Sequence, residues 1–146
     1  MRLLLLTLLS LQFTAYWASG ASRPNIILFV TDDQSPIAGC YGSADIQTPH
    51  LDTLAAEGTR FTHAFATTAS CSASRSVILS GLHNHRNGQY GHTHAFHKFA
   101  SFPSVAAVSL PLQMKQAGYR TAQIGKYHVA PVAVFDFEQR LPGNAR

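Results

Sequence analysis

The segment NIILFVTDD, from Asn25 to Asp33, decides the fold that we expect for this chain. The residues from Ile26 to Val30 are apolar at every position, and most of them are branched. Such a run predicts a strand that is covered on both faces, as in a parallel sheet. The run ends in two aspartates, so carboxylates stand at the carboxyl end of the predicted strand.

Helix and strand signals alternate along the rest of the chain. Further strands are predicted over residues 60–66 and 119–125, and short helices over residues 48–58, 74–80 and 110–117. This alternation predicts an α/β fold with a mostly parallel sheet flanked by helices. Three strands would leave bare sheet edges, so we expect the chain to be an incomplete, N-terminal part of a larger domain.

The composition is that of a globular protein of about one domain. Hydrophobic residues make up 46% of the 146 residues and charged residues 12%, which argues against disorder. The formal net charge of +4 includes no run of lysine or arginine, so we expect no nucleic-acid partner.

Residues 1–20, MRLLLLTLLSLQFTAYWASG, have the layout of a secretory signal peptide. One arginine precedes a leucine-rich run, and Ala18 and Gly20 suit a cleavage site after Gly20. The alternative is a membrane anchor, but the run is interrupted by polar residues and falls short of the ~20 residues that a spanning helix needs. We therefore expect export, to the exterior, the periplasm or a lysosome-like lumen, without a stable membrane anchor.

Asp32 and Asp33 are candidate metal ligands. Adjacent carboxylates repel each other, and a divalent cation explains a pair at a strand end, where ligands collect in open α/β sheets. Oxygen ligands favour Ca²⁺ or Mg²⁺ over Zn²⁺. A solvated turn or a helix cap is the alternative interpretation of the pair.

Four other residues predict chemistry on an anion. Cys71 and Arg75 flank the predicted start of a helix, which attracts anions, and arginine donates a fork of hydrogen bonds to a tetrahedral oxyanion. Lys126 and His128 follow the last predicted strand, where a lysine can neutralise an anion and a histidine can exchange a proton. Together with a divalent cation, these residues predict chemistry on a sulfate or phosphate ester.

Other interpretations of the cysteines and histidines stay open. In an exported protein, Cys71 could form a disulfide with Cys40. Six histidines lie between His63 and His97, and HTHAFH, which begins at His92, invites a zinc hypothesis. Their spacing fits no specific zinc pattern and we see no cysteine or carboxylate partner nearby, so we expect pocket or surface histidines.

The segment CSASR, from Cys71 to Arg75, resembles the signature of the sulfatase family, in which alanine or proline and then arginine follow the cysteine. Matching segments surround it in the family's order, across residues 23–137: RPNIILFVTDD, GCYG, TPHLDTLAAEGTRFTHAF, SRSVILSGLHNHRNGQYG and AGYRTAQIGKYHVAP. These segments most resemble those of the family branch whose members act on N-sulfoglucosamine.

The resemblance implies that residues 21–146 are the N-terminal part of a sulfatase catalytic domain. It implies conversion of Cys71 to formylglycine by a formylglycine-generating enzyme during export. It also implies that Asp32, Asp33 and the formylglycine bind Ca²⁺, with Mg²⁺ as the other possible ion.

The resemblance also implies catalytic roles. Arg75 would hold the formylglycine, Lys126 would contact the sulfate, and His128 would help the hydrated aldehyde turn over. That hydrate attacks sulfur, the alcohol or amine leaves, and the remaining hydroxyl then expels sulfate. The implied activity is hydrolysis of sulfate esters or N-sulfates of sulfated glycans.

Two departures from the family pattern give an alternative. Ala73 stands where most members have proline, and the family's later metal ligands, in a DNG-type motif, have no match here. The alternative is a truncated, catalytically inactive sulfatase fragment with at most weak metal or anion binding. A phosphatase of the same superfamily is disfavoured, because those enzymes usually place serine or threonine at the nucleophile position.

Overall fold

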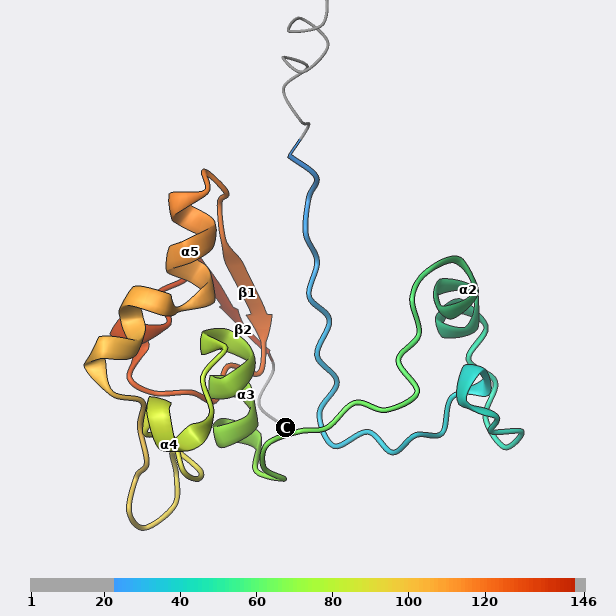
Figure 1. Cartoon of the computed structure of the whole chain (residues 1–146), viewed down its shortest axis with the longest axis horizontal. Helices are drawn as coiled ribbons and strands as arrows, with labels where there is room; N and C mark the ends of the chain where they lie inside the picture. The colour runs from blue at the N-terminus through green and yellow to red at the C-terminus, as the bar shows by residue number, and fades with distance from the viewer. Residues whose placement is uncertain (1–22, 144–146) are drawn as a thin grey trace, which may run out of the picture. The chain divides into compact units, whose positions relative to one another are not determined.

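The computed structural model describes residues 23–143 (Figure 1). The chain divides into two units, with the boundary between Asp33 and Gln34. The predicted signal peptide lies outside the described residues. Within residues 23–143, none of the helices has the length and hydrophobicity of a transmembrane span.

The described part of the first unit, residues 23–33, contains no strand, so the strand prediction for Asn25 to Asp33 is wrong. Its apolar side chains are exposed, Ile27 by 85% and Phe29 by 89%. A strand exists through hydrogen bonds to a neighbouring strand. Within the described residues, the one sheet is formed by residues 122–125 and 139–142, and the apolar run of residues 26–30 has no hydrogen bonds to it.

Helix α2 (Pro49–Glu57) begins and ends as its sequence predicts, with Thr48 before it and Gly58 after it. The short 3-10 helix η2 (Gly39–Tyr41) packs against it. The Asp52 carboxylate joins the two, because it accepts hydrogen bonds from the Cys40 amide at 2.6 Å and from the Thr48 hydroxyl at 3.0 Å. A Cβ atom at Gly39 would lie 2.6 Å from that carboxylate, so a larger residue there would have to displace the Asp52 side chain.

Helix α3 (Cys71–Ser80) begins three residues before the predicted start at residue 74. It ends at Gly81, which has a φ of 67° and donates its amide to the Val77 carbonyl. Its buried face consists of small residues, Ser72, Ala73, Ser76 and Ser80. The four-residue helix α4 (Asn84–Asn87) follows directly, inside a segment that the sequence predicts as loop.

Two parallel strands form the sheet, β1 (Ala122–Gly125) and β2 (Gln139–Pro142), with Ala122 paired to Gln139. The strand predicted over residues 60–66 is absent, and β2 was not predicted. Helix α5 (Leu110–Gln116) precedes β1 and confirms the prediction for residues 110–117. The 3-10 helices η3 (Pro103–Val108) and η4 (Val132–Val134) complete the second unit.

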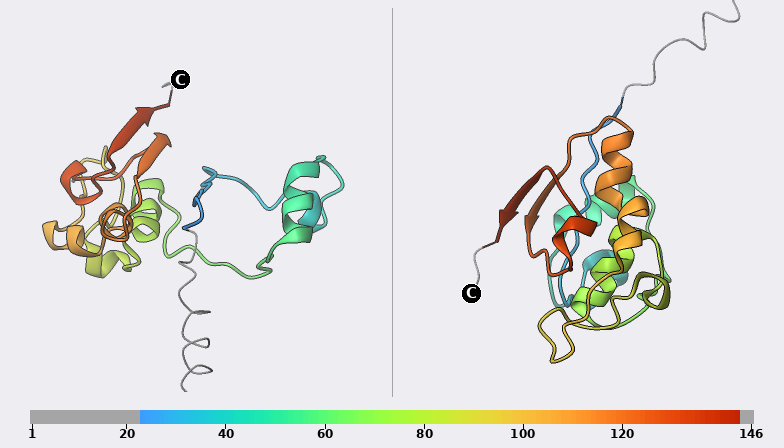
Figure 2. Two further views of the ribbon diagram at one scale, coloured as in Figure 1. Left: turned by 90° about the horizontal axis from the view of Figure 1, so that it is seen from above. Right: turned by 90° about the vertical axis from the view of Figure 1, so that its left-hand side faces the viewer.

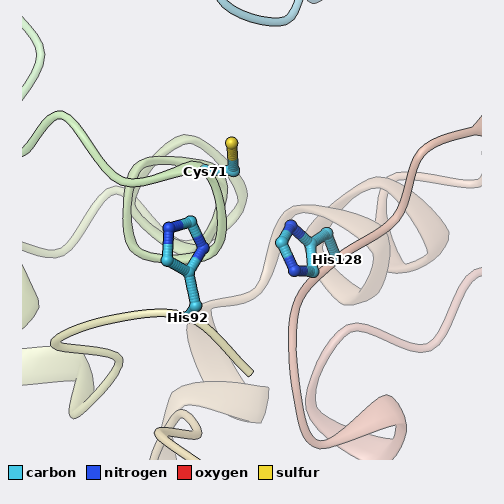
Figure 3. A group of neighbouring side chains, drawn as sticks. All are labelled: Cys71, His92 and His128. Carbon is cyan, nitrogen blue, oxygen red and sulfur yellow. The ribbon is translucent and has the colours of Figure 1, made fainter. Parts of the chain in front are cut away.

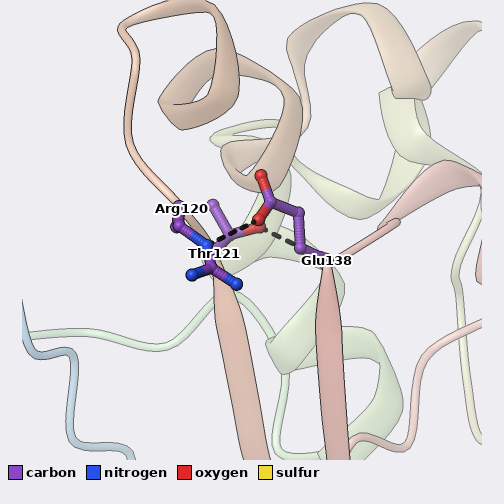
Figure 4. Close-up of polar contacts among 3 residues, drawn as sticks. All are labelled: Arg120, Thr121 and Glu138. Atoms are coloured by element: carbon purple, nitrogen blue, oxygen red, sulfur yellow. Dashed lines mark hydrogen bonds and ion pairs between the residues drawn. The ribbon is translucent and has the colours of Figure 1, made fainter.

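The two strands of the sheet run side by side in the same direction (Figure 2), and the core of the second unit is small. Four apolar side chains are buried in it: Val105, Val129, Val134 and Phe135. At the start of the strand pair, the Glu138 amide donates to the Thr121 hydroxyl at 3.2 Å, and Arg120 pairs with the Glu138 carboxylate at 3.4 Å (Figure 4). The Arg120 side chain is 81% exposed, so this ion pair contributes little stability.

Candidate active site

Cys71 is the first residue of α3, and its side chain is half-buried. Ser70 precedes the helix with extended backbone. Both Cys71 and Cys40 are free thiols, which contradicts the disulfide alternative. The thiol therefore stands where the unpaired amides of the first helical turn collect positive potential.

Two histidines from distant parts of the sequence lie beside Cys71 (Figure 3). One ligand atom each from Cys71, His92 and His128 lie within 4.8 Å of one another. The prediction that the histidine-rich segment has no cysteine partner nearby is wrong, because Cys71 is distant in sequence but adjacent in space. Cys71 and His128, both predicted site residues, are brought together.

His94 completes a stack of imidazole rings. Its Nδ1 atom lies 2.8 Å from Nε2 of His128, and the two rings are 4.9 Å apart at an angle of 6°. The His92 ring stacks on His94 at 4.7 Å. The sequence predicts pocket or surface histidines in the HTHAFH run, and it does not indicate that His92 and His94 lie beside His128.

A buried serine and a half-buried asparagine hold the histidine segment against α3. The Ser72 hydroxyl accepts a hydrogen bond from the Thr93 amide at 3.1 Å. The Asn84 side-chain amide donates to the Ala73 carbonyl at 2.9 Å and to the Gln89 carbonyl at 2.7 Å. The residues that flank His92 are thereby fixed to the first turn of the helix that carries the thiol.

Gln89 joins the histidine segment to the segment that carries His128. Its side chain is fully buried and donates to the carbonyls of Gly91 at 3.0 Å and Phe99 at 2.7 Å. Its side-chain oxygen accepts from the Ala130 amide at 3.4 Å. One buried amide therefore joins the residue before His92 to a residue shortly after His128, a role that the sequence did not indicate.

Arg75 and Lys126 bring positive charge to the same place. The Arg75 guanidinium donates to the Lys126 carbonyl at 2.8 Å, which joins α3 to the end of β1. Burial lowers the pKa of the His128 imidazole below its ordinary value of 6.5, and the charge of Lys126 lowers that pKa further. Smaller contributions in the same direction come from His94, His92 and Arg75. The neutral form of His128 is thereby favoured near pH 7.

Asp32 and Asp33 belong to the first unit, where they end the exposed apolar segment. The backbone of Asp33 is left-handed, with a φ of 55°. The groups gathered in the second unit are a thiol and imidazoles, whereas Ca²⁺ takes oxygen ligands. The donors of Cys71, His92 and His128 are therefore not of the type that Ca²⁺ takes.

Comparison with known proteins identifies the family. The model of the family described as Sulfatase matches residues 24–141. The chain belongs to the sulfatase family. Its fold agrees with the expected α/β class, because helices accompany a parallel strand pair and the sulfatase fold is matched in a solved structure. That structure, from work on glycosaminoglycan metabolism by Bacteroides thetaiotaomicron, has a TM-score of 0.59 and 25% identity, over 73% of this chain and 25% of the other.

Two curated relatives of this sulfatase-family chain act on amino sugars by name. Human N-sulphoglucosamine sulphohydrolase is 46% identical over 118 residues, which cover 80% of this chain and 23% of the human protein. N-acetylglucosamine-6-O-sulfatase of Bacteroides thetaiotaomicron is 43% identical over 73% of this chain and 18% of that protein. The chain thus spans a quarter or less of the length of these relatives.

Proposed function

We propose that this chain carries the nucleophile-bearing part of a sulfatase that hydrolyses sulfate esters or N-sulfates of sulfated glycans. The observation that carries the proposal is the placement of CSASR at the start of α3, with His128 beside Cys71 and Arg75 bonded to the Lys126 carbonyl. The identity of 46% to human N-sulphoglucosamine sulphohydrolase supports an N-sulfoglucosamine substrate.

Cys71 fits the role of a formylglycine precursor. It is a free, half-buried thiol at the beginning of a helix, and the signature arginine lies one helical turn further on. When formed, formylglycine supplies a hydrated aldehyde whose oxygen is the nucleophile toward sulfur. We propose that a formylglycine-generating enzyme is the partner that converts this residue during export, directed by a signal peptide over residues 1–20.

The surrounding residues suit the charge and the proton changes of the reaction. Arg75 and Lys126 supply positive charge, which stabilises the anionic oxygens of a sulfate group. His128 has a lowered pKa and is therefore neutral near pH 7, so its imidazole can accept a proton. These assignments give each predicted catalytic residue a role that its chemistry supports.

We propose that two carboxylates of the first unit are ligands of a bound Ca²⁺ ion. Asp32 and Asp33 supply oxygen atoms, the ligand type that Ca²⁺ takes and that Mg²⁺ also accepts. The support is this donor chemistry and the resemblance of the NIILFVTDD segment to the family. No proton transfer or bond change assigned above depends on the ion.

A chain without catalytic activity, with at most weak metal or anion binding, is the second candidate. The observation that favours it is the exposed apolar run, in which Ile27 and Phe29 are almost fully exposed. An exposed apolar surface of this kind favours aggregation in water, and an aggregated chain would not catalyse.

Mass spectrometry tests the proposal directly. The chain is exported from a host that contains the modifying enzyme, and the tryptic peptide from Phe61 to Arg75 is measured. We expect oxygen in place of sulfur at position 71, together with release of sulfate from an N-sulfated glucosamine. The variant Cys71→Ser should lose sulfate release, whereas Cys40→Ser should keep it.

Two outcomes would contradict the proposal. An intact Cys71 thiol in protein that releases sulfate would exclude the formylglycine nucleophile. Formylglycine at position 71 without any sulfate release would favour the inactive candidate.

A further inference from the structure

We propose that Cys71, His92 and His128 form a binding site for Zn²⁺ as long as Cys71 remains a thiol. The proposal goes beyond the sulfatase function and does not rest on it, because it concerns the unconverted side chain. Conversion of Cys71 would remove the sulfur ligand and, with it, the site.

The spacing of the three side chains is close to what zinc requires. Their ligand atoms lie within 4.8 Å of one another. Around a tetrahedral zinc with ordinary bond lengths, neighbouring ligand atoms are about 3.3 to 3.6 Å apart. Binding zinc would therefore require the three ligand atoms to approach by about 1 Å, through rotation of their side chains.

Two ring nitrogens are available for the metal. Nδ1 of His92 and Nδ1 of His128 are both buried, and neither has a hydrogen-bond partner among the described residues. Burying a polar atom without a partner is costly, and a metal bond removes that cost. Figure 3 shows the two imidazole rings side by side near the thiol.

His94 is suited to support the site without binding the metal. It lies 2.8 Å from Nε2 of His128, which leaves Nδ1 of His128 as the free nitrogen. With zinc on Nδ1 of His128, its Nε2 carries the proton and donates a hydrogen bond to Nδ1 of His94, which takes the place that a carboxylate, a carbonyl or a water usually has beside a metal-bound histidine. His94 is therefore a positioning residue in this proposal.

The donor set selects the kind of metal. One thiolate and two imidazoles suit Zn²⁺, whereas Ca²⁺ and Mg²⁺ take oxygen ligands. Binding releases the Cys71 thiol proton to solvent, and a water molecule completes four ligands. Arg75 and Lys126 lie near His128 and repel a cation, so the negative thiolate is essential and two histidines alone would not suffice.

Zinc titration of the untagged full chain, expressed without the modifying enzyme, tests the site. We expect one Zn²⁺ per chain in competition with a chromogenic chelator. Cys71→Ser and His92→Gln each remove a metal ligand and should weaken zinc binding at least tenfold. His94→Gln removes the hydrogen-bond partner of a ligand and should weaken zinc binding by about tenfold. Cys40→Ser and His97→Gln are matched controls that should bind zinc like the parent chain. Equal binding by the parent chain and Cys71→Ser would overturn the proposal.

A second measurement needs no variant. Zn²⁺ should slow the alkylation of Cys71 by iodoacetamide at least tenfold and leave Cys40, also half-buried, unprotected. Equal alkylation of Cys71 with and without Zn²⁺ would overturn the site even if every variant misfolded. A chain that carries formylglycine at position 71 should not bind zinc. The zinc proposal is therefore tested on the unconverted chain and the sulfatase proposal on the converted chain, and either one can be refuted without the other.

Discussion

Nδ1 of His94 lies 2.8 Å from Nε2 of His128, which joins the histidine-rich segment to the segment that follows β1. The two residues are far apart in sequence, and their rings are stacked and nearly parallel, at an angle of 6°. Since Cys71 lies beside His92 and His128, the contact links three separate parts of the second unit at the candidate active site. The protonation of His128 is therefore sensitive to several neighbours.

The charge of Lys126 should be measurable in the titration of His128. Burial and Lys126 lower the pKa of His128 below 6.5, so Lys126→Gln should move that pKa upward. NMR titration of the metal-free chain measures it. Lys115→Gln, in the last turn of α5, is the control and should leave it unchanged. A pKa of His128 at or above 6.5 in the parent chain would be inconsistent with the burial of this ring.

The stability of the chain should fall as acid protonates His128. The folded chain binds a proton at His128 less readily than the unfolded chain, because the folded-state pKa is lowered. Stability attributable to this residue is therefore fully present above 6.5 and decreases as pH falls from 6.5 toward the folded-state pKa. Melting temperatures between pH 7.5 and about 5 should fall less in His128→Gln than in the parent chain. An identical decrease in both chains would contradict this.

Gln89 should be a major determinant of stability. Gln89→Met keeps the volume but leaves the Gly91 and Phe99 carbonyls and the Ala130 amide without their partner. With the side chain fully buried, we expect a loss of about 3 kcal/mol in the free energy of unfolding. Urea denaturation measures the loss, and Gln116→Met at the exposed end of α5 is the control. A loss no larger than that of the control would show that the amide is not essential to the fold.

Local signals made helices α2 and α5 predictable. α2 and α5 each have proline in the first turn and a glycine shortly after the last turn, and these residues act on their own neighbours. The strands depend on partners, and an apolar run such as Ile26 to Val30 indicates burial without specifying a neighbour. β2 was missed because QRLP has charge and proline in place of alternating apolar residues.

The candidate site was predictable only in part. Cys71, Arg75, Lys126 and His128 were singled out by their positions at the ends of predicted elements. His92 and His94 were not, because their approach to Cys71 depends on the turn that Asn84 and Gln89 hold in place. Side-chain to backbone bonds of this kind leave no periodic pattern in a sequence.

Calcium should stabilise the protein through Asp32 and Asp33 if the proposed metal assignment is right. A ligand that binds only the folded state raises the melting temperature, by an amount set by its concentration relative to its dissociation constant. We expect Ca²⁺ to raise the melting temperature of the exported chain and the double variant Asp32→Ala/Asp33→Ala to show no such rise. Asp45→Ala removes an exposed carboxylate elsewhere and should respond like the parent chain. A calcium response that persists in the double variant would place the ion on other oxygen atoms and exclude this pair as its ligands.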